Sequence, residues 1–477
     1  MERPIRVLRF GSSVLRSEAD LPTAVQEIYR EWRRGAAVVA VVSAFGDTTD
    51  DLLKRAEQLG LPPSPGAVAA LLATGEAAAS ALLTLALQRS GLPATLLDAH
   101  TARLATRGDL LDAELVVASS DGIRRALRDN IVVIPGLAGR DGDRPVPSGP
   151  PHPPLRVALL GCGTVGGGVL ERLLARPDLF RVIGVAVRDR ERALRSGLPH
   201  RLPVAGPVAL AEGEADVVVE LLGGREPARR AVVRALKLGK SVVTANKALL
   251  AEEIDSLEGL AARSGARLLY SASVGGALPA LETVRRCAGR IRAISGVLNG
   301  TCNYVLDRLT AGDSFETAVA AARTSGFAEV DPALDLDGSD AAQKLTLLVR
   351  EAFGVLPRWD ALPRLGIAGL DRKSLASAGR RGRVVRLVAS AERTPAGLRA
   401  SIRPVEVPRA HPFARTSGAG NALRIETTDG EVIDVAAQGA GRWPTCEAVL
   451  ADLYDLAAAH RDSAGLEETA EAEEGAA

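Results

Sequence analysis

Apolar runs that end in small polar turns recur along the chain and predict the strands of α/β domains. Amphipathic helical patterns separate three such runs near the start of the chain, at 5–10, 36–42 and 131–135. Strands that alternate with helices in sequence form doubly wound parallel sheets, which is the fold predicted for the region that starts at residue 155. The predicted strands of that region are 155–160, 182–187, 216–222, 241–245 and 267–274.

A glycine-rich turn follows the strand at 155–160 and opens a helix that continues to residue 174. The glycines permit a tight turn and a close approach of the backbone to a pyrophosphate, and the helix N-terminus is the positive end of a dipole. With a strand before it and a helix after it, the motif predicts a Rossmann-type dinucleotide-binding domain. The residues of this GxGxxG turn are Gly161, Gly163, Thr164, Val165 and Gly166.

The strand at 182–187 ends in Arg188 and Asp189, where such domains contact the ribose of the adenosine half. Arg188 in the first of these positions favours a 2′-phosphate and hence NADP, whereas Asp189 keeps NAD possible. Solvated surface side chains without a ligand are the alternative interpretation. The predicted cofactor is therefore NADP, with NAD as the alternative.

A glycine turn with acidic side chains passes into an amphipathic helix between residues 325 and 353. Asp340 and Lys344 stand four residues apart on one helical face, and the apolar face fixes the rotation that aims them at the acidic turn. Several carboxylates around one lysine suit a small zwitterion with an amino group to hold and a proton to move. A capped helix beside a solvated acidic loop is the alternative. The acids of the turn are Glu329, Asp331, Asp335 and Asp337.

Two other turns carry groups that suit the same chemistry. Lys247 follows the strand at 241–245, at the carboxyl edge where parallel sheets bind ligands. With Lys344 it forms a pair of ammonium groups that fit around one substrate, although a solvated lysine is the simpler interpretation. The turn at Asn299, Gly300 and Thr301 has backbone amides that suit a carboxylate.

Composition excludes several classes of function. The 477 residues are enough for roughly two to four domains, and 59 Lys and Arg nearly balance 58 Asp and Glu. No electrostatic footprint for nucleic acid or an anionic membrane results, so a small molecule is the expected partner. The four cysteines lack the spacing of disulfide frameworks or zinc sites. The charged start and the lack of a long uncharged apolar run predict a soluble cytoplasmic protein.

Four motifs carry a resemblance over the first part of the chain: RFGSSVL at 9–15, VVSAFGDTTDDLL at 41–53, LLATGEAAASALL at 71–83 and VVIPGLAG at 132–139. This part resembles the front of an aspartate kinase of the amino acid kinase fold. The family has a lysine and a glycine pair where this chain has Arg9 and Ser12, which alters the phosphate contacts. The family's second half, with most of the ATP site, is missing after residue 139. The resemblance therefore implies a degenerate lobe without kinase activity.

Seven motifs carry a second resemblance, which covers residues 155 to about 460. They are GCGTVGGG, VVVELLGG, VVTANKALLA, SVGGALP, GVLNGTCNYVL, GFAEVDPALDLDGSDAAQKL and GAGRWPTCEAVLADL. In order and spacing they resemble homoserine dehydrogenase. The resemblance implies reversible hydride transfer between NAD(P) and the pair L-aspartate 4-semialdehyde and L-homoserine, within threonine, methionine and isoleucine biosynthesis.

The same resemblance implies roles for single residues. Lys344 matches the proton-transferring lysine, and Lys247 matches a second active-site lysine that also faces the nicotinamide. Glu329 and Asp340 match acids that contact homoserine, with Asp335 close by. The matching cofactor contacts are Gly326, Gly441, Thr164 and Val165.

A sodium ion is implied less firmly. Relatives often bind it through a glutamate and three backbone carbonyls. Ser271 stands in the glutamate's place, and the carbonyl positions match Val274, Gly276 and Leu278. A neutral serine weakens such a site and makes structural sodium doubtful.

The chain is thus predicted to be a homodimer or a larger homo-oligomer built from several domains. Strand patterns at 383–389 and 398–405 resemble the sheet through which relatives dimerise, and a last helix is predicted at 445–459. The predicted domains are a kinase-like lobe (1–144), a proline-rich linker (145–154), a Rossmann domain (155–280), an α+β catalytic and dimerisation domain (281–440), a helix returning to the Rossmann domain (441–460) and a disordered acidic tail (461–477).

Two other functions fit parts of the sequence. A bifunctional kinase-dehydrogenase would need the missing second half of the kinase. A non-catalytic regulatory or scaffolding subunit would have no need to keep Lys247, Glu329, Asp340 and Lys344 together.

Overall fold

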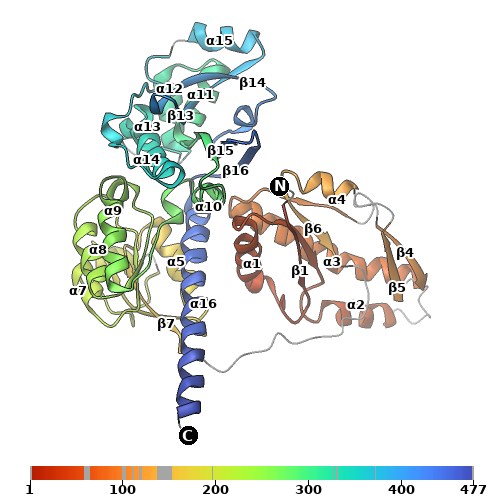
Figure 1. Ribbon diagram of the computed structural model, residues 1–477. Helices are drawn as coiled ribbons and strands as arrows, with labels where there is room; N and C mark the ends of the chain where they lie inside the picture. The colour runs from red at the N-terminus through yellow and green to blue at the C-terminus, as the bar shows by residue number, and fades with distance from the viewer. Residues whose placement is uncertain are drawn as a thin grey trace. The chain divides into compact units, whose positions relative to one another are not determined.

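The structure is a computed structural model, shown in Figure 1. The chain divides into two compact units, Met1–Pro151 (unit 1) and His152–Ala477 (unit 2). The structure describes residues 3–58, 65–98, 104–109, 112–117, 121–136, 153–195, 197–325, 327–328, 331–370 and 372–474.

Unit 1 contains a parallel sheet with helices packed on it. Its elements are β1 (Ile5–Phe10), η1 (Glu18–Asp20), α1 (Leu21–Arg33), β2 (Ala37–Val42), α2 (Thr48–Glu57), α3 (Pro65–Arg89), β3 (Ala94–Leu96), β4 (Leu104–Asp109), β5 (Asp112–Val117), α4 (Asp121–Ala126) and β6 (Ile131–Pro135). The strand order is β1-β2-β6-β3, and all three pairings are parallel. The central strands β2 and β6 are almost wholly buried, as continuous apolar runs in a parallel sheet require.

The helix α3 is, within the described residues, the one helix long and apolar enough to cross a membrane by length and composition. That stretch is Gly66–Arg89, with a mean hydropathy of 1.6. A core helix passes the same test. Because α3 packs against β2, β3, β6, α1 and α2, we assign it to the helical layer of the unit 1 sheet.

The first part of unit 2 is a doubly wound domain, as predicted. Its elements are β7 (Leu155–Leu160), α5 (Thr164–Leu174), β8 (Phe180–Ala186), α6 (Arg190–Arg195), α7 (Pro207–Glu212), β9 (Val217–Glu220), α8 (Ala228–Lys237), β10 (Ser241–Thr244), α9 (Lys247–Ser264) and β11 (Leu268–Leu269). The parallel sheet has the order β11-β10-β9-β7-β8. The chain leaves β7 toward β8 on one side and β9 on the other, so the ligand crevice of such a sheet lies at the carboxyl ends of β7 and β9.

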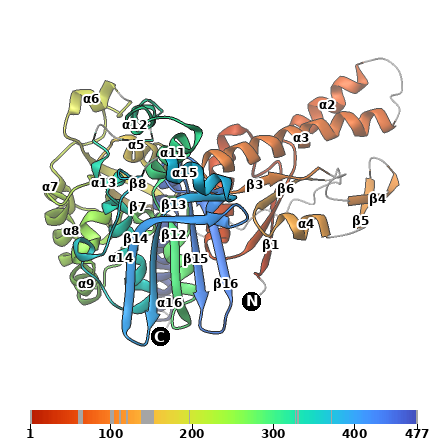
Figure 2. The ribbon, with the colours of Figure 1, turned by 90° about the horizontal axis from the view of Figure 1, so that it is seen from above.

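The second part of unit 2 is an α+β domain around an antiparallel sheet in the order β14-β13-β12-β15-β16, which Figure 2 shows. The helices α11 and α14 pack on this sheet. The elements are η2 (Ser271–Ser273), α10 (Ala280–Arg286), β12 (Ile291–Val297), α11 (Gly300–Ala311), α12 (Phe315–Thr324), α13 (Ala333–Leu336), α14 (Ser339–Phe353), η3 (Trp359–Ala361), α15 (Arg372–Arg380), β13 (Arg383–Thr394), β14 (Gly397–Pro408), η4 (Pro412–Arg415), β15 (Gly420–Thr427), β16 (Val432–Gln438) and α16 (Arg442–Glu474).

The strand predicted at 267–274 is much shorter in the structure, where β11 contains only Leu268 and Leu269. The reason is local competition for the backbone. The Ser271 N–H donates to Asp452 Oδ2 at 3.0 Å, so it is not available for a ladder of strand hydrogen bonds, and the chain turns into η2.

The C-terminal helix also differs from the prediction. We predicted a helix at 445–459 and a disordered tail at 461–477, but α16 runs from Arg442 to Glu474. Its first half is held by packing against α5, beside which Figure 1 shows it running. The following residues are rich in alanine and glutamate, which have high helix propensity, so an existing helix extends through them at little cost.

Candidate active site

The helix α14 brings two of the predicted catalytic side chains together. Asp337 caps its start, because the carboxylate accepts hydrogen bonds from the Ser339 N–H at 2.8 Å and the Ser339 hydroxyl at 2.9 Å. Gly338 precedes the helix with φ at 87°, a left-handed conformation that suits glycine. Buried apolar side chains along α14 then fix its rotation, which places Asp340 and Lys344 in the interior of unit 2.

Asp340 lies between two lysines. Its Oδ2 is 2.8 Å from Lys344 Nζ, and its Oδ1 is 3.2 Å from Lys247 Nζ. Lys247 is the first residue of α9, so this second ion pair joins the Rossmann domain to the α+β domain. Lys344 Nζ also donates to the Leu298 carbonyl oxygen at 2.7 Å. The structure therefore brings both predicted lysines to a single carboxylate.

Asp340 is only 8% exposed, yet it is held as an anion. Burial by itself raises the pKa of a carboxyl, but the charges of Lys344 and Lys247 and the hydrogen bonds from Lys344 and Asn299 outweigh it. The pKa of Asp340 is therefore well below its usual range. A carboxylate of this kind fixes the direction of both ammonium groups and offsets the repulsion between them.

Asn299 connects two acids to the start of α11. Its Nδ2 donates to Asp335 Oδ1 at 2.7 Å and to Asp340 Oδ2 at 2.8 Å. Its Oδ1 accepts from the Cys302 N–H at 2.8 Å, which caps the helix. Burial, followed by the charge of Asp340, raises the pKa of Asp335. Two carboxylates and an amide thus face the same region of the molecule as Lys344.

Gly300 and Thr301 form the first turn of α11. The Thr301 hydroxyl lies 2.6 Å from the Phe327 carbonyl oxygen and 3.1 Å from Asp335 Oδ2. A Cβ on Gly300 would lie 2.9 Å from the Ala419 Cα, so only glycine fits there. The first N–H groups of a helix have no partner within the helix, and Asn299 accepts only that of Cys302. The role of this turn toward a carboxylate stays a prediction.

The turn between β7 and α5 fits the pyrophosphate of a dinucleotide. A Cβ on Gly161, whose φ is 103°, would lie 2.6 Å from the Leu221 carbonyl oxygen, and one on Gly166 would lie 2.0 Å from the Gly161 carbonyl oxygen. These contacts bring the helix close to the strand, as the motif requires. Gly163 gives α5 no side-chain cap, and a Cβ there would meet no atom within 4 Å. The backbone N–H groups of Thr164 and Val165, in the first turn of α5, are thus accessible to an anion.

The remaining predicted cofactor contacts lie on segments that are far apart in the sequence. Arg188 is exposed just beyond β8, and the next residue, Asp189, caps α6 by accepting from the Arg192 N–H at 2.9 Å. Gly441 precedes α16 with φ at 124°. Gly326 and Glu329 lie outside the described residues.

The turn that matches a sodium site has a buried acid beside it, Asp452, which was not predicted. The Ser271 hydroxyl donates to Asp452 Oδ1 at 2.7 Å, and Asp452 is 1% exposed. Among the residues that the structure describes, no group of three or more His, Cys, Asp or Glu side chains could hold a metal ion. The three carbonyl positions, Val274, Gly276 and Leu278, lie in the turn after η2.

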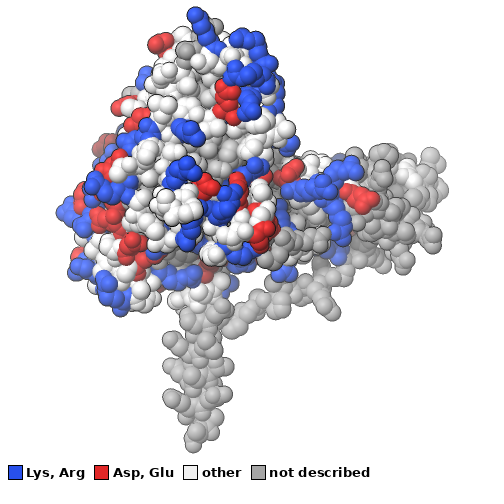
Figure 3. Space-filling model, turned by 45° about the horizontal axis from the view of Figure 1, so that its top comes forward, with Lys and Arg blue, Asp and Glu red and all other residues white. Residues whose placement is uncertain are grey.

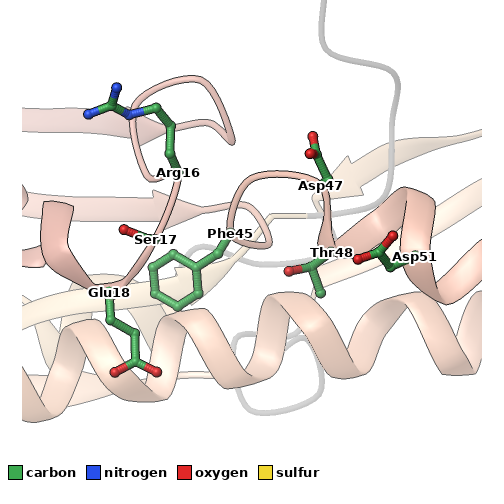
Figure 4. Close-up of a pocket in the computed structure, with 7 residues that line it drawn as sticks. All are labelled: Arg16, Ser17, Glu18, Phe45, Asp47, Thr48 and Asp51. Carbon is green, nitrogen blue, oxygen red and sulfur yellow. The ribbon is translucent and has the colours of Figure 1, made fainter.

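Unit 1 has a surface pocket lined by residues of the segments that follow β1 and β2, which Figure 4 shows. Three of its lining side chains are acids and one is a base, Arg16, whose guanidinium already pairs with Asp20 at 3.0 Å. An excess of carboxylates repels phosphate groups. The lining residues are Arg16, Ser17, Glu18, Phe45, Asp47, Thr48 and Asp51.

Two further groups near the site were not predicted, because their contacts depend on the tertiary fold. The Leu298 carbonyl, which accepts from Lys344, also lies 3.4 Å from Asn421 Nδ2 of β15. Glu220, at the end of β9, is fully buried and bonded to Thr244 and Asn246. A signal for Glu220 was present, because a charged residue that ends an apolar strand at the ligand edge is unusual; for Leu298 no side-chain signal exists.

Comparisons with protein families assign both units. Residues 279–454 match the family described as homoserine dehydrogenase, and 161–271 match its NAD-binding domain. Residues 4–149 match the amino acid kinase family.

Individual proteins with similar sequences or structures point to the same family. The homoserine dehydrogenase of Neisseria gonorrhoeae is 34% identical over 316 residues, which are 64% of this chain and 72% of the relative. The crystal structure of a homoserine dehydrogenase from Thiobacillus denitrificans is 34% identical, with a TM-score of 0.60, over 65% of this chain and 74% of that one. A hyperthermophilic archaeal homoserine dehydrogenase mutant in complex with NADPH is 25% identical, with a TM-score of 0.55, over 63% and 96%.

Proposed function

The chain belongs to the homoserine dehydrogenase family, and we propose that its active site is the cluster around Asp340. It is an oxidoreductase that interconverts L-aspartate 4-semialdehyde and L-homoserine. The observation that carries the site assignment is the contact of Lys344, Lys247 and Asn299 with one carboxylate. We place the reaction in threonine, methionine and isoleucine biosynthesis.

Lys344 is the proposed proton donor. Asp340 and the Leu298 carbonyl hold its ammonium group at 2.8 and 2.7 Å. In the reducing direction it donates a proton to the aldehyde oxygen as that oxygen becomes an alkoxide; in the oxidising direction its neutral amine removes the proton of the homoserine hydroxyl. Bound NAD(P) supplies the hydride exchange at C4 of the nicotinamide.

The remaining polar groups are proposed to orient the substrate. Glu329 and Asp335 would hold its amino group, and the first amides of α11, around Asn299 to Thr301, would hold its carboxylate. Support comes from Asp335, which Asn299 and Thr301 hold in a defined direction. Lys247 would bind between the substrate and the nicotinamide.

NADP is the proposed cofactor. The β7–α5 turn fits the pyrophosphate of either dinucleotide. Two observations support a preference for NADP. Arg188 is exposed just beyond β8. One oxygen of the Asp189 carboxylate already accepts a hydrogen bond from the Arg192 N–H, so Asp189 is less available to a ribose hydroxyl. A similar structure is described as a complex with NADPH.

The Arg188→Ala variant is expected to lose roughly tenfold to a hundredfold of the preference for NADPH over NADH, because a charge-assisted hydrogen bond contributes about 1.5–3 kcal/mol. The ratio of kcat/KM for the two cofactors measures the change. Arg190→Ala, at an exposed arginine two residues on, is the control. An unchanged ratio in Arg188→Ala would show that Arg188 faces solvent.

Unit 1 is proposed to have no aspartate kinase activity. The acidic lining of its pocket, with Arg16 already paired, is unsuited to ATP. Arg9 and Ser12 stand where the family has a lysine and a second glycine. We infer that unit 1 is a folded accessory domain of the dehydrogenase.

The full chain, given ATP, Mg²⁺ and aspartate, is therefore expected to form no aspartyl phosphate above the level of a blank without protein. Trapping with hydroxylamine detects the product. The same preparation must reduce aspartate semialdehyde, which controls for misfolded protein. Aspartyl phosphate formation would restore the bifunctional alternative.

We propose that the chain acts in the cytoplasm as a homodimer or a larger homo-oligomer. Figure 3 shows acidic and basic side chains interspersed over much of the drawn face, as the near balance of charge suggests. The sheet of the α+β domain carries small residues in direct register, such as Ser295 opposite Ser390, and such a face suits packing against a second copy.

A further inference from the structure

Glu220 is a buried carboxylate that the proposed mechanism does not use. It is the last residue of β9 and is 0% exposed. It stands at the carboxyl ends of β7 and β9, where the strand order reverses. The next residue, Leu221, lies against the turn between β7 and α5. A Cβ added to Gly161 of that turn would be 2.6 Å from the Leu221 carbonyl oxygen.

The side chain of Glu220 accepts hydrogen bonds at both of its carboxyl oxygens. Oε2 accepts from the Thr244 hydroxyl at 2.6 Å, and Oε1 accepts from the Leu222 N–H at 2.8 Å and from Asn246 Nδ2 at 3.4 Å. Burial raises the pKa of Glu220 above its usual range, and the hydrogen bonds from Thr244, Leu222 and Asn246 act in the opposite direction. Within the described residues no lysine, arginine or histidine pairs with it. Burial of a carboxyl group without a paired cation costs free energy, so packing alone does not explain why this position has a glutamate.

The hydrogen-bond partners of Glu220 are close in sequence to Lys247. Thr244 ends β10, and its Oγ1 accepts from the Asn246 N–H at 3.0 Å. Asn246 caps α9, since its Oδ1 accepts from the Leu249 N–H at 3.2 Å, and its Nδ2 donates to the Gly224 carbonyl at 2.6 Å. Lys247, the next residue, is the start of α9 and reaches Asp340.

We propose that Glu220 is a positioning residue that holds Lys247 in its catalytic position through Thr244 and Asn246. The carboxyl group of Glu220 holds the end of β10 at Thr244 and the helix cap at Asn246. These two residues set the direction in which the side chain of Lys247 leaves the start of α9. The proposal rests on the proposed function, since it assigns Glu220 a role in that reaction. Small displacements of a positioned group lower the rate of the chemical step more than they weaken substrate binding.

The Glu220→Gln variant tests the role with little change of shape. Its amide oxygen keeps the bonds from Leu222 and Asn246, and its amide nitrogen faces Thr244 Oγ1, whose hydroxyl rotates to accept. The anchoring of Thr244 weakens, because its hydroxyl no longer donates to this side chain. We expect kcat to fall about tenfold, with KM for aspartate semialdehyde changed by less than about threefold.

A double-mutant cycle with Lys247→Met separates positioning from general support of the fold. If Glu220 acts through Lys247, Glu220→Gln lowers kcat about tenfold in the wild-type background and by less than about twofold in the Lys247→Met background. The same loss in both backgrounds, or no loss in the wild-type background, overturns the proposal.

Glu447→Gln is the matched control. Glu447 is also 0% exposed, and it lies beside Arg172 of α5 at 4.0 Å. Its substitution is expected to affect kcat equally in both backgrounds. Should Glu220→Gln fail to fold by circular dichroism, Thr244→Val, which removes one bond of the same chain, replaces it in the cycle and is judged by the same outcomes. A wild-type protein without dehydrogenase activity would contradict the proposed function itself, before any variant is compared.

Discussion

Replacing Lys344 with methionine is expected to lower kcat for reduction of aspartate semialdehyde about a thousandfold, because the side chain keeps its length and loses the proton it donates. The affinity for NADPH should change by less than about twofold, since a general acid contributes mainly in the transition state. Steady-state kinetics and a fluorescence titration with NADPH measure the two quantities. The result would place Lys344 in the chemical step rather than in cofactor binding.

Lys373→Met is the control for this substitution, because Lys373 is an exposed lysine of α15. It should keep native kcat and native affinity for NADPH. A Lys344→Met enzyme with near-native kcat at neutral pH would mean that another group donates the proton.

The Asp340→Asn substitution is expected to have the second largest effect. It keeps the shape of the side chain but leaves Lys344 and Lys247 facing a neutral amide. We expect kcat to fall about a hundredfold, because the proton donor is no longer held in one direction. The free energy of unfolding should fall by about 3 kcal/mol at neutral pH, the low end for a broken buried pair, because Lys247 is 36% exposed.

The stability difference has a defined pH dependence. The lysines lower the pKa of Asp340 in the folded protein, so its stabilising contribution is complete above the unfolded carboxyl pKa of about 4 and is lost as the pH falls through the folded value. Wild type and Asp340→Asn should therefore differ by a constant amount from neutral pH to about pH 5, and converge only in stronger acid. Denaturant unfolding at a series of pH values measures this.

Asp360→Asn is the matched control for the pH series, because Asp360 makes an exposed ion pair with Arg358 at 2.7 Å. It should leave the free energy of unfolding nearly unchanged over the whole pH series, because solvent screens an exposed ion pair. Convergence of wild type and Asp340→Asn already near neutral pH would contradict the lowered pKa of Asp340.

Local rules predicted the parts of the site that depend on a single element. Asp340 and Lys344 were placed together because residues four apart share a helical face, and the structure joins them at 2.8 Å. Lys247 was singled out because the carboxyl edge of a parallel sheet binds ligands, and it reaches the same carboxylate. The glycines of the β7–α5 turn were predicted from their GxGxxG spacing between a strand and a helix.

Contacts between elements distant in sequence could not be predicted in this way. Asn299 was expected to offer a backbone amide, but its side chain also bridges Asp335 and Asp340, residues about 40 positions later. The Leu298 carbonyl carries no side-chain signal at all. The short β11 and the long α16 differ from prediction because Asp452 competes for the Ser271 backbone and because helix propensity extends a helix that packing has started.

The most direct test of the central claim is a single assay of the purified full chain with L-aspartate 4-semialdehyde and NADPH. Loss of the nicotinamide absorbance is followed, and the product is identified by mass spectrometry. The site around Asp340 predicts one L-homoserine for each NADPH oxidised, with turnover that Lys344→Met abolishes. A folded protein that binds NADPH and forms no homoserine, or one whose turnover survives in Lys344→Met, would contradict the account.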